Sequence, residues 1–487
     1  MDASAELKEA WEHGRAGRYE EAQAIAARVL AREPGHPGAL HLMGAAAYSQ
    51  RRYDLAEGYL NKSLETAPQD RETLGTYAAM LMAQGREEEA LAAARRLLEL
   101  DPNSLMSLTC MGCVLAGRMD FAEAMPLLER AMKLAPQNRN VLLSLGAARS
   151  AMGDFEGAKQ VLGQAVIFRP DDPEIAMGLA IAHLLSGNWQ RGWEWYAKRW
   201  HPGGPARRHT QIPAWNGQDL RGKRILVWTE QGYGDAIQFI RYGAWLKQQG
   251  AAILVECAPA LKALFALYPH VDAVRQQGET LPPFDFQIPL LDLARMHGTT
   301  PMTVPASVPY LRADARKVSS WRQRLAKEAP GLRIGLAWAG NPDHPKDHFR
   351  SVALADLAGL GCGGVTFVSL QVGKPEGQAT PEGMRLIRYA QKLSTFEETA
   401  ALMENLDLVI TVDTAIAHLA GALGRPVWTL LPFSCDWRWL AGRDDTPWYP
   451  TMRLFRQKRP RDWAEVIGRV RAELSAWIAG RGQGAIK

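Results

Sequence analysis

Three segments of the sequence gather side chains that could bind an anion or move a proton. They are TEQGYGDAIQF (229–239), WAGNPDHPKDHFRSV (338–352) and VITVDTAIAHLAGALGRPVWTLL (409–431). Each contains or follows a run of β-rich apolar residues that predicts a strand, so the polar residues are expected in loops at strand ends. These loops carry the candidate functional residues of the chain.

The first loop is similar to a dinucleotide-binding fingerprint, but Ile237 occupies the position of the third glycine, so NAD binding has little support. Its glycines Gly232 and Gly234 predict a tight turn with Asp235 at the start of a helix, and Gln238 follows on that helix. An aspartate there is either a helix cap or a general base, and the residue types leave both roles open.

The second loop offers amide and cationic groups that suit an anionic ligand. The candidate residues for such a ligand are Gly340, Asn341, Lys346 and Arg350. The histidines of the loop are interrupted by proline, so no helical face aligns them as metal ligands, and we expect no metal. A solvated surface loop is the alternative.

The third loop is a buried strand followed by Asp413, Thr414 and Ala415 and then by a helix. A helix N-terminus presents unpaired N–H groups and a partial positive charge, and the small Ala415 allows a phosphate to approach closely. His418 lies four residues after Thr414, so its ring can reach the same ligand. A buried histidine with only a structural role is the alternative.

Several classes of site and function are disfavoured by the sequence. GQDLRGKR (217–224) nearly matches a P-loop, but Arg224 replaces the Ser or Thr and the segment precedes its strand. The chain contains no Asp-x-Asp pair, which removes the usual metal-binding device of nucleotide-sugar enzymes. The net charge of +5 does not favour nucleic acid, and no apolar run reaches the roughly 18 residues of a membrane span. Five scattered cysteines and an acidic start predict a cytoplasmic protein without a disulfide framework.

The charge is unevenly distributed along the chain. Residues 1–200 hold 22 basic and 26 acidic side chains, whereas residues 201–487 hold 35 basic and 26 acidic ones. An anionic ligand is therefore expected to bind in the second half.

The first half has a period of 34 residues. Proline recurs at one position of the period and alanine at another, and a third position holds only alanine or glycine. These positions are Pro34, Pro68, Pro102, Pro136 and Pro170; Ala22, Ala56, Ala90, Ala124 and Ala158; and Ala10, Gly44, Ala78, Gly112, Gly146 and Ala180. The pattern resembles the tetratricopeptide repeat, and it predicts an α-solenoid over 1–204. We expect this solenoid to bind an extended protein segment, and a rigid spacer or an oligomerisation arm is the alternative. An aromatic stripe at Trp189, Trp193, Tyr196 and Trp200 predicts a capping helix that packs onto the next domain.

The second half alternates strands and helices, which predicts a parallel α/β architecture. A Pro- and Gly-rich linker is expected over 205–222, a first Rossmann-like domain over 223–310, and a second one with a C-terminal helix over 311–487. The fold class is therefore an α-solenoid followed by an α/β region. Two such domains that face one another across a cleft form the architecture called GT-B.

The first and third loops resemble the motifs of family 9 glycosyltransferases, the heptosyltransferase group. ILVWTEQGYGDAIQF is similar to their glycine–Asp loop, and VDTAIAHLAGALGRPVWTLL to their donor motif, although Ala415 stands where glycine is usual. The resemblance implies that Asp235 is the catalytic base, that Gly232, Gly234 and Gln238 lie on the acceptor side, and that Asp413, Thr414, Ala415 and His418 bind the donor. Repeat-fused glycosyltransferases, including O-GlcNAc transferase, share this combination of domains.

We therefore expect a metal-independent, inverting glycosyltransferase that uses a nucleotide-sugar and no cofactor. Its repeats would recruit a protein acceptor, and flagellin is one candidate by resemblance to repeat-fused flagellin glycosyltransferases. A lipopolysaccharide or other lipid-linked acceptor is the enzymatic alternative. A non-catalytic scaffold with a nucleotide-binding domain is the alternative from another class.

Overall fold

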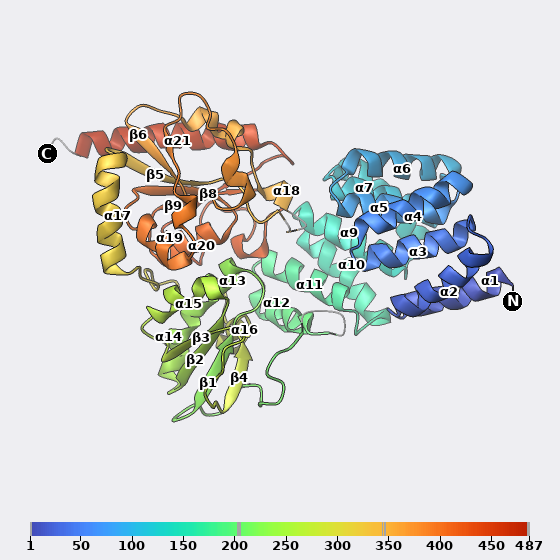
Figure 1. Cartoon of the computed structure of the whole chain (residues 1–487), viewed down its shortest axis with the longest axis horizontal. Coiled ribbons are helices and arrows are strands. Elements are labelled where there is room, and N and C mark those ends of the chain that lie inside the picture. The colour runs from blue at the N-terminus through green and yellow to red at the C-terminus, as the bar shows by residue number, and fades with distance from the viewer. Residues whose placement is uncertain (1, 202–205, 343, 345–346, 485–487) are drawn as a thin grey trace. The chain divides into compact units, whose positions relative to one another are not determined.

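The computed structural model describes residues 2–201, 206–342, 344 and 347–484, with side chains up to residue 480 (Figure 1). The chain forms two compact units, Met1–Gly178 and Leu179–Lys487. The division falls inside a helix, on the N-terminal side of the boundary expected at residue 204. In the part of the chain that the structure describes, no helix is long and apolar enough to cross a membrane.

The first unit is a series of antiparallel helix pairs, as the 34-residue period predicts. The helices are α1 (Ala3–Arg15), α2 (Tyr19–Arg32), α3 (Pro37–Ser49), α4 (Tyr53–Thr66), α5 (Arg71–Ala83), α6 (Glu87–Leu100), α7 (Leu105–Gly117), α8 (Phe121–Leu134), α9 (Arg139–Ala151) and α10 (Phe155–Phe168), followed by α11 (Pro173–Leu185), which continues into the second unit. A β-carbon at Gly44, Gly112 or Gly146 would lie 2.6–2.7 Å from a leucine of the paired helix. The small residues are therefore required for the close approach of the helices within each pair.

The turn inside each helix pair uses one backbone conformation. The φ angle lies between 73° and 85° at the four turn glycines, Gly17, Gly85, Gly153 and Gly187. Arg51 and Met119 occupy the same position of the repeat and have φ of 59° and 67°. Glycine adopts this left-handed conformation without strain, whereas residues with a β-carbon do not. The left-handed turn is thus common to these repeats, although two of them have a residue other than glycine at this position.

The second unit contains a small parallel sheet near its beginning. Among the residues described, its strand order is β3-β2-β1-β4. The strands are β1 (Arg224–Trp228), β2 (Ala252–Cys257), β3 (Ala273–Gln276) and β4 (Phe286–Pro289). The helices are α13 (Tyr233–Phe239), α14 (Gly243–Gln248), α15 (Pro259–Ala266) and α16 (Asp292–His297), with the 3-10 turn η2 (Ile240–Tyr242) between the first two.

A larger parallel sheet follows, with the order β10-β9-β8-β5-β6-β7 over the described residues. Its strands are β5 (Leu332–Ala337), β6 (Val365–Ser369), β7 (Leu386–Ile387), β8 (Leu408–Val412), β9 (Val427–Leu431) and β10 (Met452–Arg456). Its helices are α17 (Ala315–Glu328), α18 (Asp347–Arg350), α19 (Phe396–Met403), α20 (Ala415–Ala422) and α21 (Trp463–Gly484), with the 3-10 turns η3 (Leu354–Leu360), η4 (Lys374–Gly377), η5 (Ala390–Lys392) and η6 (Trp437–Trp439). Figure 1 shows α21 on one face of this sheet and α19 and α20 on the other.

Each strand expected from the apolar runs of the second half is present, and two further strands are not evident from the sequence. β3 and β10 are short and carry charged residues, so their period-2 pattern is weak. The C-terminal helix packs on the second sheet, where Val466, Val470 and Leu474 lie in the same core as Phe455. The C-terminal helix therefore covers one face of the second sheet.

The aromatic stripe lies on α12 (Trp189–Tyr196) and ends at Trp200, directly after the turn η1 (Ala197–Arg199), all in the second unit. Trp189, Trp193 and Tyr196 are buried, and the indole N–H of Trp193 donates to the carbonyl of Thr299 at 2.8 Å. As expected, this helix packs onto the α/β region.

Candidate active site

Asp235 lies in the first turn of α13, directly after the carboxyl end of β1. One of its carboxylate oxygens, Oδ2, accepts a hydrogen bond from the backbone N–H of Gly232 at 2.8 Å. The other, Oδ1, accepts from the guanidinium of Arg438. The side chain is 16% exposed, and burial raises the pKa of Asp235 while Arg438 opposes that rise. Asp235 therefore caps its helix and is also a stronger base than an exposed aspartate.

Arg438 connects the loop after β1 with the loop after β9. Besides Asp235, its guanidinium donates to Oε1 of Gln238 at 3.0 Å and to Asp436 at 2.8 Å. Its side chain is only 8% exposed. A buried guanidinium with these partners fixes the two loops relative to each other and adds a positive charge at Asp235.

The N-terminus of α20 lies against the glycine loop, which is the turn at residues 232–234 before Asp235. Thr414 caps the helix, with its hydroxyl accepting from the N–H of Ile416 at 3.3 Å. A β-carbon at Gly234 would lie 2.7 Å from Cδ2 of His418 and 3.5 Å from Cα of Ala415. Because only glycine leaves this space, the first and third predicted loops meet at Gly234.

His418 is buried between the two loops in a neutral form. Its ring stacks on Trp439 with centroids 5.1 Å apart, and Nδ1 lies 2.9 Å from the hydroxyl of Tyr449. Burial lowers the pKa of His418 well below its usual range, and nearby arginines, Arg438 among them, lower it further. At neutral pH the imidazole is thus an uncharged hydrogen-bonding group in a positively charged environment.

Asp413 and Arg350 lie within electrostatic range of the same site. Burial raises the pKa of Asp413 to about 6, and the carboxylate of Asp436 adds to that rise while Arg350 opposes it. Arg350 is held by Asp347, whose Oδ1 accepts from Nε at 3.1 Å. A β-carbon at Gly340 would collide with the side-chain ends of this Asp347–Arg350 pair, so glycine leaves room for the pair in its present position.

The structure brings most of the predicted site residues together and leaves a few apart. Gly232, Gly234, Asp235 and Gln238 lie on one side, and Thr414, Ala415 and His418 on the other, joined by Arg438. Asn341 is exposed, and its carbonyl accepts from the N–H of His344. Lys346 lies outside the described residues.

Arg438 and Tyr449 are the residues of the site that sequence reasoning missed. They lie within FSCDWRWLAGRDDTPWYP (433–450), together with Trp437 and Trp439, for which the sequence leaves two roles open, as a cover for the base or sugar or as packing residues. Both Trp437 and Trp439 are buried, which agrees with packing. An arginine between two tryptophans beside an aspartate was the available signal, but its partner lies 203 residues away in the sequence.

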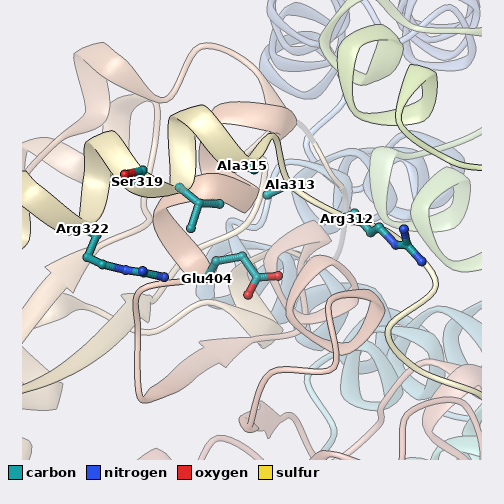
Figure 2. Close-up of a pocket in the computed structure, with 7 residues that line it drawn as sticks. Arg312, Ala313, Ala315, Ser319, Arg322 and Glu404 are labelled. Atoms are coloured by element: carbon teal, nitrogen blue, oxygen red, sulfur yellow. The ribbon is translucent and has the colours of Figure 1, made fainter.

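The two cavities described in the second unit lie away from this site. One, of about 410 Å³, is lined by residues of α17 and by Glu404, with Arg312 and Arg322 at its ends (Figure 2). The other, of about 570 Å³, is lined by Gly331 and by residues 361–366 at the amino ends of β5 and β6. Neither is lined by Asp235 or by residues 413–418, and we assign neither to the donor. Among the described residues, no group of three or more His, Cys, Asp or Glu side chains could hold a metal ion.

Comparison with known proteins finds a family match in each half of the chain. Residues 15–72 and 115–182 match the tetratricopeptide repeat family, and residues 344–436 match glycosyltransferase family 9 (heptosyltransferase). The chain combines tetratricopeptide repeats with a region similar to family 9 glycosyltransferases. This confirms the combination expected from the sequence and supports glycosyltransferase activity. The match includes Arg350 and α20 but not the Asp235 loop.

The relatives cover different shares of the chain. Protein FlbA of Caulobacter vibrioides is 29% identical over 334 residues, which is 61% of this chain and 54% of FlbA, so the chain spans about half the length of that relative. A thermophilic tetratricopeptide protein of Thermus thermophilus is 19% identical, with a TM-score of 0.35, over 38% of this chain and all of its own. PilF of Pseudomonas aeruginosa is 17% identical, with a TM-score of 0.34, over 42% of this chain and 93% of its own.

Proposed function

We propose that this chain is a cytoplasmic, metal-independent glycosyltransferase of the GT-B type that moves a sugar from a nucleotide-sugar to a hydroxyl group of a protein. The observation that carries the proposal is the meeting of Asp235 with the N-terminus of α20, across Gly234. A partly buried carboxylate of raised pKa and an anion-binding helix end are the two groups that such a transfer needs.

The donor diphosphate binds at the N-terminus of α20. Thr414 and the free N–H groups of the first turn face the phosphates, and Arg350 and Arg438 supply positive charge. These groups stabilise the negative charge that develops on the leaving nucleoside diphosphate. Neutral His418 contributes a hydrogen bond rather than a charge.

Asp235 takes the proton of the acceptor hydroxyl while its oxygen attacks the anomeric carbon. The new carbon–oxygen bond forms as the bond to the diphosphate breaks, and the diphosphate leaves with the electron pair. A single displacement of this kind inverts the configuration at the anomeric carbon. Protonation of Asp235 removes the base, so the reaction needs its carboxylate form.

The test is the release of nucleoside diphosphate from a panel of nucleotide sugars, with and without EDTA. We expect one donor or a few to be cleaved slowly in the absence of acceptor, and cleavage to survive chelation. Loss of all cleavage on addition of EDTA contradicts the metal-independent mechanism. Failure to bind or cleave any donor favours the scaffold alternative.

The repeats are proposed to select the protein acceptor, and flagellin is one candidate. The matching experiment compares the full chain with a shortened chain that begins at residue 171 and so keeps α12, which belongs to the second unit. We expect equal donor cleavage and a sharp fall in acceptor modification by the shortened chain. Equal modification by both assigns the repeats a spacer role. The heptosyltransferase match favours lipopolysaccharide as the second candidate acceptor, which the same assay includes.

A further inference from the structure

The residue that introduces the glycine loop has an unusual backbone conformation. Gln231 has φ of 59°, in the left-handed region, and it lies directly before Gly232, whose N–H binds Asp235. For a residue with a β-carbon this conformation costs about 1 kcal/mol or more. It persists only where surrounding contacts maintain it.

Contacts from α12 and η1 hold this residue and its neighbour. The hydroxyl of Tyr196 accepts from Nε2 of Gln231 at 2.9 Å and donates to its Oε1 at 3.1 Å. Arg199 donates to both carboxylate oxygens of Glu230, at 2.6 and 3.1 Å, and pairs with Asp292 at 2.8 Å. The side chains of Arg199 and Glu230 are 3% and 5% exposed, so this ion pair is buried.

The helix that supplies these contacts is itself firmly packed. Trp189 stacks on Trp448 with centroids 5.0 Å apart, and Trp193 meets the edge of Trp437 at 5.2 Å. Tyr196 also packs against Trp437, the neighbour of Arg438, at 6.0 Å. One short helix therefore contacts the loop that carries Asp235 and the loop that carries Arg438.

We propose that Tyr196 is a positioning residue that acts through Gln231 to orient Asp235. Its hydroxyl holds Gln231 in the left-handed conformation, which directs the N–H of Gly232 toward the carboxylate of Asp235. Arg199 fixes the preceding residue and gives the loop a second anchor. The effect of Tyr196 on catalysis rests on the proposed function, whereas its effect on the conformation of residues 231–235 does not.

The test is hydrogen–deuterium exchange on the full-length protein, compared among wild type, Tyr196→Phe, Gln231→Gly and the double variant. Tyr196→Phe keeps the buried ring and removes only the hydroxyl, so we expect exchange at residues 231–235 to rise by up to about tenfold. Exchange in β1 stays unchanged. Glycine adopts the left-handed conformation without an anchor, so in the Gln231→Gly background the Tyr196→Phe change has no further effect.

Tyr242→Phe is the matched control, because it also removes a buried phenol hydroxyl, one that lies 2.7 Å from Thr299. We expect it to leave exchange at residues 231–235 unchanged. Unchanged exchange at residues 231–235 in Tyr196→Phe overturns the proposal. So does an equal increase when Tyr196→Phe is introduced into the wild type and into the Gln231→Gly variant. An equal increase in the Tyr242→Phe control also does so, because the effect is then a general loss of stability.

A kinetic measurement tests whether Tyr196 affects catalysis through Asp235. With a nucleotide sugar that the wild type cleaves, Tyr196→Phe lowers kcat by up to about tenfold and leaves KM for the donor unchanged, because α20 is not disturbed. A rise in KM alone overturns the assignment to Asp235. If the wild type cleaves no donor, the proposed function fails, while the exchange result still decides the role of Tyr196 in the loop.

Discussion

Arg438 donates a hydrogen bond to Asp235 across 203 positions of the sequence. The contact joins the loop after β1 to the loop after β9, and Gln238 and Asp436 complete the coordination of the guanidinium. It neutralises the buried carboxylate of Asp235. It also places a positive charge where a leaving diphosphate develops negative charge in the proposed reaction.

The pH dependence of turnover reports the pKa of Asp235. Burial raises this pKa, and the base acts in its carboxylate form, so turnover falls as the pH falls through the raised value. We expect the acidic limb of kcat/KM at a higher pH than an exposed aspartate would give. An acidic limb at or below the ordinary pKa of aspartate contradicts this assignment.

The stability of the protein should also depend on the protonation state of Asp235. Turnover needs the carboxylate form, whereas the fold is more stable with the protonated form. Since folding raises the pKa of Asp235, its protonated form is favoured in the native state. Its stabilising contribution is complete below the unfolded-state pKa and is lost as the pH rises through the folded-state value. Asp235→Asn removes this slope, which urea denaturation at a series of pH values measures.

Arg438→Gln should destabilise the second unit and shift the pH profile. It leaves the buried carboxylate of Asp235 without its cation, and breaking a buried pair in this way costs about 3 kcal/mol. The acidic limb of turnover moves to higher pH, because Arg438 lowers the pKa of Asp235. Arg453→Gln is the control, since the Arg453–Glu473 pair is 45% and 42% exposed and its loss should cost at most about 1 kcal/mol. Equal effects of the two changes show that the Asp235 contact has no special role.

Gly234→Ala tests the contact between the glycine loop and α20. The added methyl group lies 2.7 Å from the ring of His418, which Trp439 supports from the stacked side. We expect a loss of about 1–3 kcal/mol in stability and a marked fall in donor cleavage. Gly363→Ala is the matched change, since its β-carbon has no atom within 4 Å. Normal cleavage by Gly234→Ala shows that the loops can separate without loss of function.

Arg51→Gly and Met119→Gly should each stabilise the repeats. Both residues occupy the left-handed turn position that glycine fills in other repeats. Removal of the β-carbon relieves strain that exceeds the entropic cost of glycine in the unfolded chain, for a net gain of about 0.5–1 kcal/mol per site. Gly85→Ala, at a φ of 73°, should have the reverse effect. Urea denaturation of the full chain measures all three, and a loss of stability in Arg51→Gly contradicts the turn argument.

The sequence predicts the elements of this protein better than it predicts their contacts. The period of 34 residues fixes the helix pairs because small residues are needed wherever two helices meet, as at Gly44 and Leu60. Strands such as β9 are fully buried and therefore appear as nearly continuous apolar runs. β10 is short, and its burial neither alternates nor is continuous, so its sequence carries little strand signal.

The sequence predicts those parts of the candidate site whose geometry is determined within a single segment. Asp235 at a helix start and Thr414 before α20 are local features, and both lie where the sequence places them. The Arg438–Asp235 and Tyr196–Gln231 contacts join segments that only the fold brings together. A long-range pair of this kind leaves no pattern in a single sequence.

The most direct test of the account compares nucleoside diphosphate release by the wild type and by Asp235→Asn, at saturating donor. Donor binding is measured in parallel by thermal stabilisation, which amounts to about 2.7 kcal/mol at 100 times the dissociation constant. Asparagine keeps the shape and the capping oxygen of Asp235 and removes its basicity, so the variant should bind donor normally. In the presence of acceptor its turnover should fall by roughly 10²–10⁴-fold. Near-normal turnover by Asp235→Asn would reduce Asp235 to a helix cap and contradict the proposed mechanism.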